Sequence, residues 1–346
     1  MSKAAELAAL IGSQTALSNR NLIINGAMQV AQRGTSVTGI TSGAYRTCDR
    51  ILFSPFGPAG TWTVTQSTDA PDGFSNSFRI DCTTADASLG ASDFVIVETK
   101  IEAQNLQHLM YGDSSAKTVT ASFYVKSNKT GTYVLELRQP DSSRLYNKTY
   151  TINAANTWEY KTLTFPGDVS GTINNDNGQG LNMNFWCAAG TNWTSGSIGT
   201  SWHTTNANRA AGVVNLADST DNDWSITGLQ LEVGEQATPF EHRSYADELR
   251  RCQRYYEKNK IGIESSTSVS NALGVAFESK TTKRATPTVV IEATGSGNKI
   301  GTGPYTQSTT LSSTYPTDSG IVGETTNGSA TGDFAGTYTV SFSAEL

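Results

Sequence analysis

The sequence predicts an all-β protein: a jelly-roll β-sandwich with a short N-terminal helix, one amphipathic helix after the sandwich, and a small C-terminal β domain. Only 16% of its 346 residues are charged, against the roughly 25% of ordinary domains. Short segments of alternating apolar and polar residues recur, and clusters of turn-forming residues separate them. This combination is typical of antiparallel sheets with neutral, polar outer faces.

The N-terminal segment differs in character from the rest of the chain. Residues 3–11, KAAELAALI, favour a helix by composition. Nine residues form a stable helix only when a partner packs against them. We therefore predict that residues 1–20 anchor or oligomerise the protein.

The sandwich is predicted over residues 21–240. Val119, Ala121, Phe123 and Val125 share one face of a strand, as the period-2 pattern of a half-buried sheet requires. Leu229, Leu231 and Val233 form a similar face in the last strand. The clearest predicted strands are residues 61–65, 77–82, 94–101, 118–126, 132–138, 148–152, 159–165, 181–188 and 224–233.

An amphipathic helix is predicted over residues 241–259. Tyr245, Leu249, Cys252 and Tyr256 fall at i, i+4, i+7 and i+11, which gives one apolar stripe. The preceding sheet is the nearest surface for that stripe. Residues 260–346 are then predicted to form a small β domain, with strands at 273–277, 288–291 and 337–342. Because this part has few apolar residues, burial against neighbouring subunits would offset its small core.

Bulk composition excludes several functions. Net charge is −6, pI is about 5.2 and no basic patch is visible, which argues against nucleic-acid binding. No window approaches ~20 apolar residues, so membrane insertion is not expected. The N-terminus lacks the features of a secretory signal peptide, which predicts retention in the cytoplasm of synthesis. The four cysteines are scattered without a Cys-x-x-Cys pair, and we expect buried free thiols: Cys48, Cys82, Cys187 and Cys252.

Several segments carry a family resemblance. They are NLIING at 21–26, QRG at 32–34, DR at 49–50, ASFYVKS at 121–127, TGTY at 130–133, ITGLQLEVG at 226–234, ATPFE at 237–241, RCQRYY at 251–256, and KRATPT at 283–288, which resembles a Met-Arg-Ala-x-Pro-Thr segment with Lys replacing Met. In this order they resemble bacteriophage tail-fibre and receptor-binding virion proteins, common in phages of aquatic bacteria. The frame also resembles the jelly roll of carbohydrate-binding modules.

The resemblance implies a structural virion component. Such a tail fibre would attach to the host surface by binding, most simply to a glycan, without catalysis. It implies a homotrimer that contacts other virion proteins, is assembled in the host cytoplasm and is released by lysis. Two alternatives stay open: a head or capsid fibre or decoration protein, and a glycan depolymerase of the tailspike kind.

No catalytic set is evident. The sequence has no Gly-x-Ser-x-Gly elbow, His-Glu-x-x-His helix or phosphate-binding glycine-rich loop. A depolymerase needs two carboxylates across a groove, and Asp168 and Asp176 on predicted turns are among the available acids. Turn carboxylates usually only form turns. We therefore predict no catalytic residues and no cofactor.

A structural calcium ion is the alternative to having no metal. Asp218, Asp221 and Asp223 form an acidic loop with oxygen ligands, although their spacing does not match the twelve-residue calcium loop. Carbohydrate-binding modules often hold calcium between an acid after the opening motif and one on the last strand. Gln29 and Thr227 stand at the corresponding positions, and neither is a carboxylate.

Sugar binding would use aromatic side chains on polar loops. Trp193 is the first candidate, because it lies in a turn-rich stretch. Trp186 and Trp202 are further candidates, although core or edge packing explains all three tryptophans as well. The Gly-, Ser- and Thr-rich residues 294–335, with Tyr305 and Tyr315, are the alternative binding surface.

Overall fold

A computed structural model describes residues 19–265, 272–293, 311–317, 320–326 and 334–346 of the chain. The predicted helix at 3–11 and Tyr305 lie outside the described residues, as does the side chain of Tyr315. The chain divides into two compact units, residues 1–245 with Leu346, and residues 246–345. In the described part no helix is long and apolar enough to cross a membrane.

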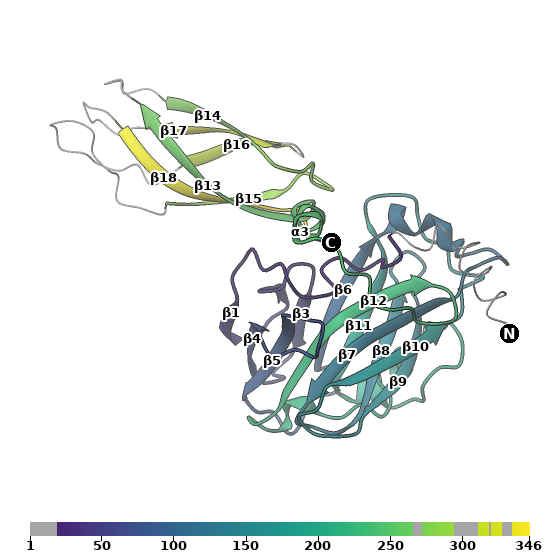
Figure 1. Cartoon of the computed structure of the whole chain (residues 1–346). Helices are drawn as coiled ribbons and strands as arrows, with labels where there is room; N and C mark the ends of the chain where they lie inside the picture. Colours follow the sequence, from purple (N-terminus) through teal and green to yellow (C-terminus); the bar gives the residue numbers. More distant parts are fainter. Residues whose placement is uncertain (1–18, 266–271, 294–310, 318–319, 327–333) are drawn as a thin grey trace. The chain divides into compact units, whose positions relative to one another are not determined.

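The first unit is a β-sandwich of two six-stranded antiparallel sheets (Figure 1). One sheet has the order β1-β4-β5-β12-β7-β10 and the other β2-β3-β6-β11-β8-β9. The strands are β1 Ser36–Ile40, β2 Ala44–Tyr45, β3 Leu52–Phe56, β4 Thr61–Ser67, β5 Ser77–Thr84, β6 Phe94–Glu102, β7 Val119–Ser127, β8 Gly131–Gln139, β9 Arg144–Ile152, β10 Glu159–Phe165, β11 Gln179–Ala189 and β12 Asp223–Val233. The predicted jelly-roll sandwich is confirmed.

Four short helical segments connect these strands: η2 Ala103–Leu109, α2 Thr191–Thr194, η3 Asn206–Asn208 and η4 Leu216–Asp218. The core lies between the sheets, where the alternating apolar residues meet. Phe123 of β7 contacts Phe185 of β11 with ring centroids 5.1 Å apart, and Phe185 contacts Trp224 of β12 at 5.7 Å. All four cysteines are free and buried, as predicted.

The motif at residues 21–26 fastens the chain start to the last strand of the sandwich. The Asn21 amide donates to the Leu229 carbonyl (3.0 Å) and accepts from the backbone N–H groups of Ile23 and Leu231. Asn25 makes three similar backbone bonds, two of them to Val30. Buried amides satisfied in this way are structural, and so the resemblance at this segment reflects folding.

The helix after the sandwich is shorter than predicted. α3 spans Tyr245–Gln253, and Tyr256 begins strand β13. Tyr245 is 56% exposed, whereas Cys252 is fully buried, so the predicted stripe is only partly a buried face. The predicted stripe needed a helix that reached Tyr256, but α3 ends at Gln253, which is why Tyr256 falls in a strand.

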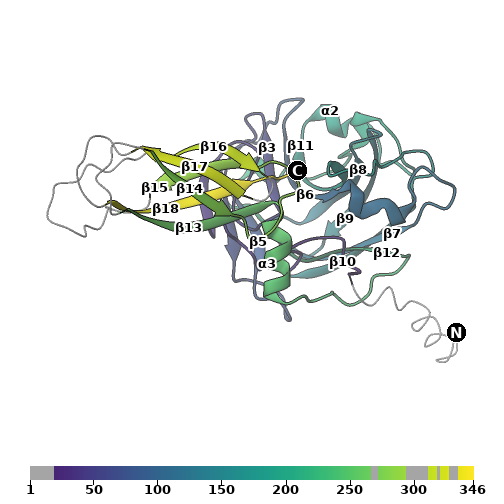
Figure 2. The same cartoon turned by 90° about the horizontal axis from the view of Figure 1, so that it is seen from above.

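The second unit continues from α3 with two three-stranded antiparallel sheets, β13-β18-β15 and β14-β17-β16 (Figure 2). Their strands are β13 Tyr256–Ser265, β14 Ala272–Glu278, β15 Thr288–Ala293, β16 Leu311–Thr317, β17 Gly320–Thr326 and β18 Phe334–Ser343. The structure therefore confirms that the C-terminal part of the chain folds as small β-sheets.

Candidate functional site

Two of the tryptophans predicted to bind sugar, Trp186 and Trp193, pack against each other. Trp186 on β11 has no exposed surface, and the half-buried Trp193 of α2 lies against it with ring centroids 5.8 Å apart. Phe94 meets both rings edge-on, and Nε1 of Trp193 donates to the Ser92 carbonyl. Because the loop after β11 folds back on its own strand, Trp186 offers no free face to a sugar and Trp193 offers only part of one.

A buried ion pair completes this cluster. Arg209 donates to both carboxylate oxygens of Glu136 at 2.7 and 2.8 Å, and its guanidinium lies 5.0 Å from the Trp186 ring and 5.2 Å from the Trp193 ring. Asn184 donates to the same carboxylate at 2.7 Å. The arrangement fastens the loop to the outer face of β8 and β11.

Trp202 is also a packing residue. It is 8% exposed, meets Tyr111 and Tyr146 edge-on, and donates to the Pro166 carbonyl at 2.8 Å. Trp186 and Trp202 are therefore both buried, with 0% and 8% of their surface exposed. Trp193 has only part of its surface exposed to solvent.

The acidic loop does not converge on a common point. Asp218 pairs with Lys129, and Asp223 pairs with Arg79 at 3.2 Å. Asp221 lies between them in sequence on an exposed turn. In the residues that the structure describes, no three His, Cys, Asp or Glu side chains gather where a metal ion would bind. The buried Thr227 donates to the Asn76 carbonyl.

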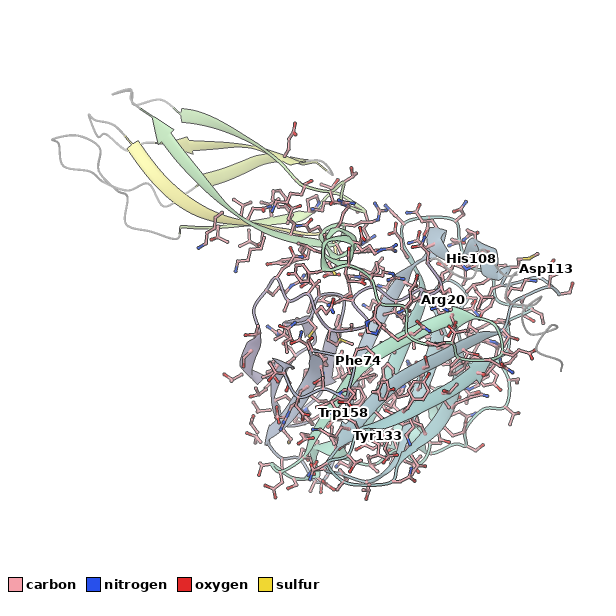
Figure 3. The ribbon with its side chains drawn as sticks, in the orientation of Figure 1. Arg20, Phe74, His108, Asp113, Tyr133 and Trp158 are labelled. Atoms are coloured by element: carbon pink, nitrogen blue, oxygen red, sulfur yellow. The ribbon has the colours of Figure 1, made fainter. Side chains whose placement is uncertain are left out.

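A groove of about 460 Å³ lies on the outer face of the sheet that contains β12, β7 and β10. Its floor is Ser122 and Tyr124 of β7 with Gly228 of β12, and Tyr160 of β10 stands at one end. The walls are two loop segments, residues 72–74 and residues 237–242. All of these residues except Glu241 line the groove. Phe74, labelled in Figure 3, comes from the first of these segments.

Five aromatic side chains form a continuous row in this groove. Ring centroids are 5.0 Å apart from Tyr160 to Tyr124, 5.6 Å from Tyr124 to Phe74, 5.1 Å from Phe74 to Phe240 and 5.3 Å from Phe74 to His242. Tyr160 is 49% exposed. The row therefore presents apolar ring surface to solvent, and the rings hold one another in place.

Strand register explains why these rings meet. Phe123 and Val125 point into the core, so Tyr124 points outward, and Tyr160 is its direct partner on β10. Gly228 has φ +61° and lies where the pairing of β12 with β7 shifts register, which marks a β-bulge. Because Gly228 has no side chain, the rings of Phe74 and Tyr124 can lie close to the backbone at the bulge.

The wall at residues 237–242 is fixed by buried polar groups of β12. The Glu232 carboxylate accepts from the Thr238 N–H at 2.8 Å and from the Thr238 hydroxyl at 2.6 Å. The Gln230 amide oxygen accepts from the Glu241 N–H at 2.9 Å. These contacts make the groove a preformed feature of the fold.

Replacing Gly228 with alanine should distort the groove. A Cβ there would lie 2.7 Å from Phe74 and 3.1 Å from Tyr124, at a φ that side chains rarely adopt. We expect a loss of about 1–3 kcal/mol in unfolding free energy, measured by urea denaturation, and a displaced Phe74. A variant with unchanged stability and an unchanged Phe74 environment would show that the bulge is not required.

The sequence contained one signal of this groove that the expectation about tryptophans missed. The outward face of residues 118–126 carries Thr120, Ser122 and Lys126, and Tyr124 is its one large ring. An aromatic residue on an otherwise polar strand face is a candidate contact residue. Its partners on β10 and on the two loops became visible only in the folded chain.

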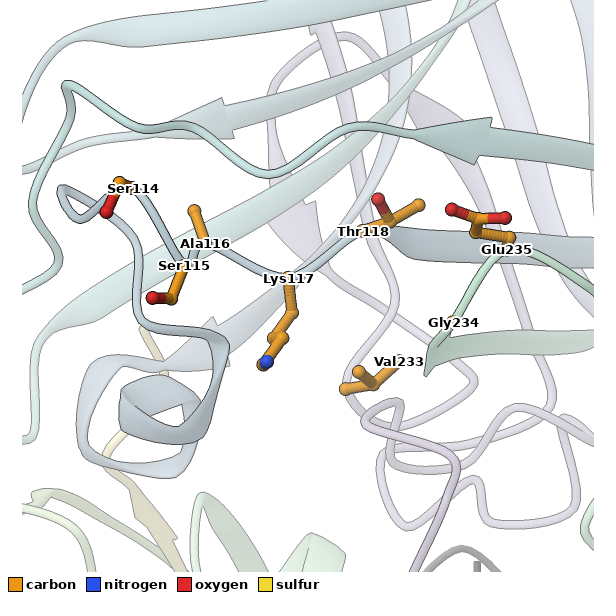
Figure 4. Close-up of a pocket in the computed structure, with 8 residues that line it drawn as sticks. All are labelled: Ser114, Ser115, Ala116, Lys117, Thr118, Val233, Gly234 and Glu235. Atoms are coloured by element: carbon orange, nitrogen blue, oxygen red, sulfur yellow. The ribbon is translucent and has the colours of Figure 1, made fainter. Parts of the chain in front are cut away.

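A second hollow, of about 340 Å³, lies between residues 114–118 and 233–235 (Figure 4). Val233 lines it and is 44% exposed, although the alternation of its strand predicted a buried position. The lining includes Lys117 and Glu235 but no aromatic ring. It therefore lacks the flat apolar surface that the first groove has.

His203, in the loop after β11, has a hydrogen-bond partner at each ring nitrogen. Its Nδ1 accepts from the Thr205 N–H, and its Nε2 lies 3.1 Å from the Asn147 amide oxygen, so the neutral ring satisfies both partners. Burial lowers the pKa of His203. Glu136 opposes that shift, and Arg144 and Arg209 add to it.

Because the folded-state pKa is lowered, the stability from His203 is complete above the unfolded-state value of about 6.5 and falls as the pH drops below it. Denaturation at about pH 7.5 and about pH 5 should show a smaller difference for His203→Gln than for the wild type. An equal difference in both proteins would assign the acid sensitivity to other groups.

No protein-family model and no curated protein matches this chain. Solved structures align with 57–62% of it. One is the enzymatically active domain of tailspike protein 4 of bacteriophage CBA120, at 13% identity and a TM-score of 0.32, with 62% of this chain covered but only 22% of that one.

A putative sugar-binding protein of Bacteroides thetaiotaomicron aligns at 11% identity and a TM-score of 0.36, with 62% of this chain and 100% of that one covered. A family 11 carbohydrate-binding module of Clostridium thermocellum, in complex with a mixed-linked tetrasaccharide, aligns at 12% identity and a TM-score of 0.29, with 60% and 98% covered. TM-scores this low assign neither family nor function to the chain.

Proposed function

We propose that the chain binds a carbohydrate in the aromatic groove of its β-sandwich, without catalysis. The observation that carries this proposal is the row of five rings, preformed on the sheet and open to solvent at Tyr160. A sugar ring stacks its C–H face on an aromatic ring, and nearby hydroxyl and carbonyl groups bind its hydroxyls. In the lining, the exposed Asp72 offers carboxylate oxygens, and the hydroxyl of Thr238, which donates to Glu232, can still accept from a sugar hydroxyl.

A role in binding alone is favoured by the charges of the groove. Asp72 is the one carboxylate in its lining. Glycoside hydrolysis uses two carboxyl groups on either side of the scissile bond. A depolymerase would therefore need a second acid that this groove does not provide.

The biological setting that we propose is a virion. The motifs at residues 21–26, 226–234, 237–241 and 251–256 resemble phage tail-fibre and receptor-binding proteins, and the groove suits attachment to a host glycan. A homotrimer would present three copies of a weak site and raise avidity. A head or capsid fibre would use the same groove, and labelling intact particles would distinguish the two locations.

Replacing Tyr160 with alanine tests the function directly. The full chain is first screened on an array of bacterial surface oligosaccharides, and the best ligand is titrated by calorimetry. We expect Tyr160→Ala to weaken binding about tenfold, because loss of one stacking ring costs about 1–1.5 kcal/mol. Tyr160 is half exposed, so folding should be retained.

Phe56→Ala is the matched control for this experiment. Phe56 is 55% exposed and lies on β3 of the other sheet. Its removal should leave the affinity unchanged. Equal loss in both variants, or no ligand on the array, would contradict binding in the groove.

A further inference from the structure

Two buried polar side chains in the second unit donate to one buried carboxylate. Glu257 and Asn259 lie two residues apart on β13, and Lys283 precedes β15. Lys283 Nζ donates to Oε2 of Glu257 at 2.5 Å, and Asn259 Nδ2 donates to its Oε1 at 2.5 Å. The three residues are 2%, 0% and 8% exposed in the order Lys283, Glu257, Asn259. An amine and a carboxamide thus bind the two oxygens of one buried carboxylate.

Glu257 and Asn259 lie on the strand at one side of the central strand β18, and Lys283 lies in the segment that leads to the strand at the other side. β13 and β15 each pair with β18, and Phe342 of β18 is the register partner of Glu257. Phe342 is fully buried, and Lys283 Nζ lies 5.8 Å from its ring centroid. The carbonyls of Gln253 and Thr281 also accept from this amine, at 2.7 and 3.1 Å. The amine is therefore oriented as well as buried.

We propose that Lys283 and Asn259 join in an intramolecular isopeptide bond and that Glu257 transfers the protons. The chain needs no cofactor or oxidant for this step. Burial lowers the pKa of Lys283, although its contact with Glu257 opposes the shift, and a buried amine is more easily neutral. Attack requires Nζ to approach Cγ of Asn259 to about 3–3.5 Å.

The chemistry balances with these three residues alone. The Lys283 ammonium gives one proton to Glu257, and the neutral amine attacks Cγ of Asn259. The Nζ–Cγ bond forms, and Glu257 relays a proton from Nζ to Nδ2. The Cγ–Nδ2 bond then breaks and ammonia leaves. Glu257 ends protonated and next to the new amide.

Such a bond would link β13, on one side of β18, to the segment that leads into β15, on the other side. The crosslinked residues are 24 positions apart in sequence, from 283 − 259. Closing a loop restricts the unfolded chain and so favours the folded one. A unit of two small sheets benefits from a covalent link more than a large core does.

Intact mass under denaturing conditions tests the proposal. The wild-type chain should lie about 17 Da, one ammonia, below its sequence mass, and fragmentation should show Lys283 linked to Asn259. Lys283→Ala, Asn259→Ala and Glu257→Gln should each have their full sequence mass. Lys280→Ala is the control, because the Lys280 side chain is exposed, and it should keep the deficit.

Asn259→Asp provides a second measurement. Loss of water in place of ammonia should change the deficit to about 18 Da, which identifies Cγ of residue 259 as the atom attacked. A wild-type chain at full sequence mass overturns the proposal whether or not the variants fold. A deficit that persists in Lys283→Ala also overturns it, because cyclisation of an asparagine elsewhere loses ammonia too.

Discussion

Replacing Arg209 with alanine is expected to lower the unfolding free energy of the sandwich by about 3–5 kcal/mol. Glu136 has no exposed surface, and Arg209 is the cation that donates to both of its oxygens. Removing the guanidinium would leave a buried carboxylate without its counter-charge. It would also remove the side chain that lies against Trp186 and Trp193.

Tryptophan fluorescence during urea denaturation measures this effect in the unit that contains the sandwich. All six tryptophans lie between residues 62 and 224, so their emission reports the sandwich and not the second unit. The double variant Glu136→Gln with Arg209→Met is the control, since removing both charges should restore much of the loss. A single variant as stable as the wild type would mean that water reaches Glu136.

Asn21→Ala is expected to cost about 2–4 kcal/mol, because each buried group left without its partner costs about 1–3 kcal/mol. Asn21 is 4% exposed and bonds one carbonyl and two N–H groups, two of these three groups belonging to β12. Its loss would release the start of the sandwich from its last strand.

The same fluorescence measurement applies to this variant. Asn175→Ala, at an exposed position between β10 and β11, is the control and should change stability by less than about 0.5 kcal/mol. Equal effects of the two substitutions would show that the Asn21 contacts do not hold the sandwich together.

Much of the fold was predictable from local pattern. The strand predicted at residues 159–165 matches β10, and eight other sandwich strands were placed within a few residues. Strands β1, β2 and β3 were not predicted, and β2 has only two residues. β3 contains Pro55 and carries little alternation, and β1 has a single buried residue at its end. β1 is assigned by its pairing with β4, β3 by its pairing with β6, and β2 by its pairing with β3.

The bulge at Gly228 corresponds to a change of alternation along β12. Trp224 and Ile226 are buried at even positions, whereas Leu229 and Leu231 are buried at odd ones. One strand can bury both pairs only if an extra residue resets the alternation between them. Glycine at that point is the residue that tolerates the required φ.

The tryptophans are a different case. Trp186 alternates with core residues on β11, so it points to the outer face, where a sugar-binding residue would be expected. The structure buries it there, because Arg209 and Trp193 return from the following loop to cover it. No local pattern predicts that a loop will fold back over its own strand.

The sequence by itself determined the fold class, the free cysteines and most strands, because period-2 alternation and turn residues act within a few positions along the chain. The tertiary structure alone decided which rings stay accessible. Tyr124, Tyr160, Phe74 and Phe240 come from four separate segments, and only strand pairing and the bulge bring them together. A binding surface built from contacts distant in sequence has no local pattern that could predict it.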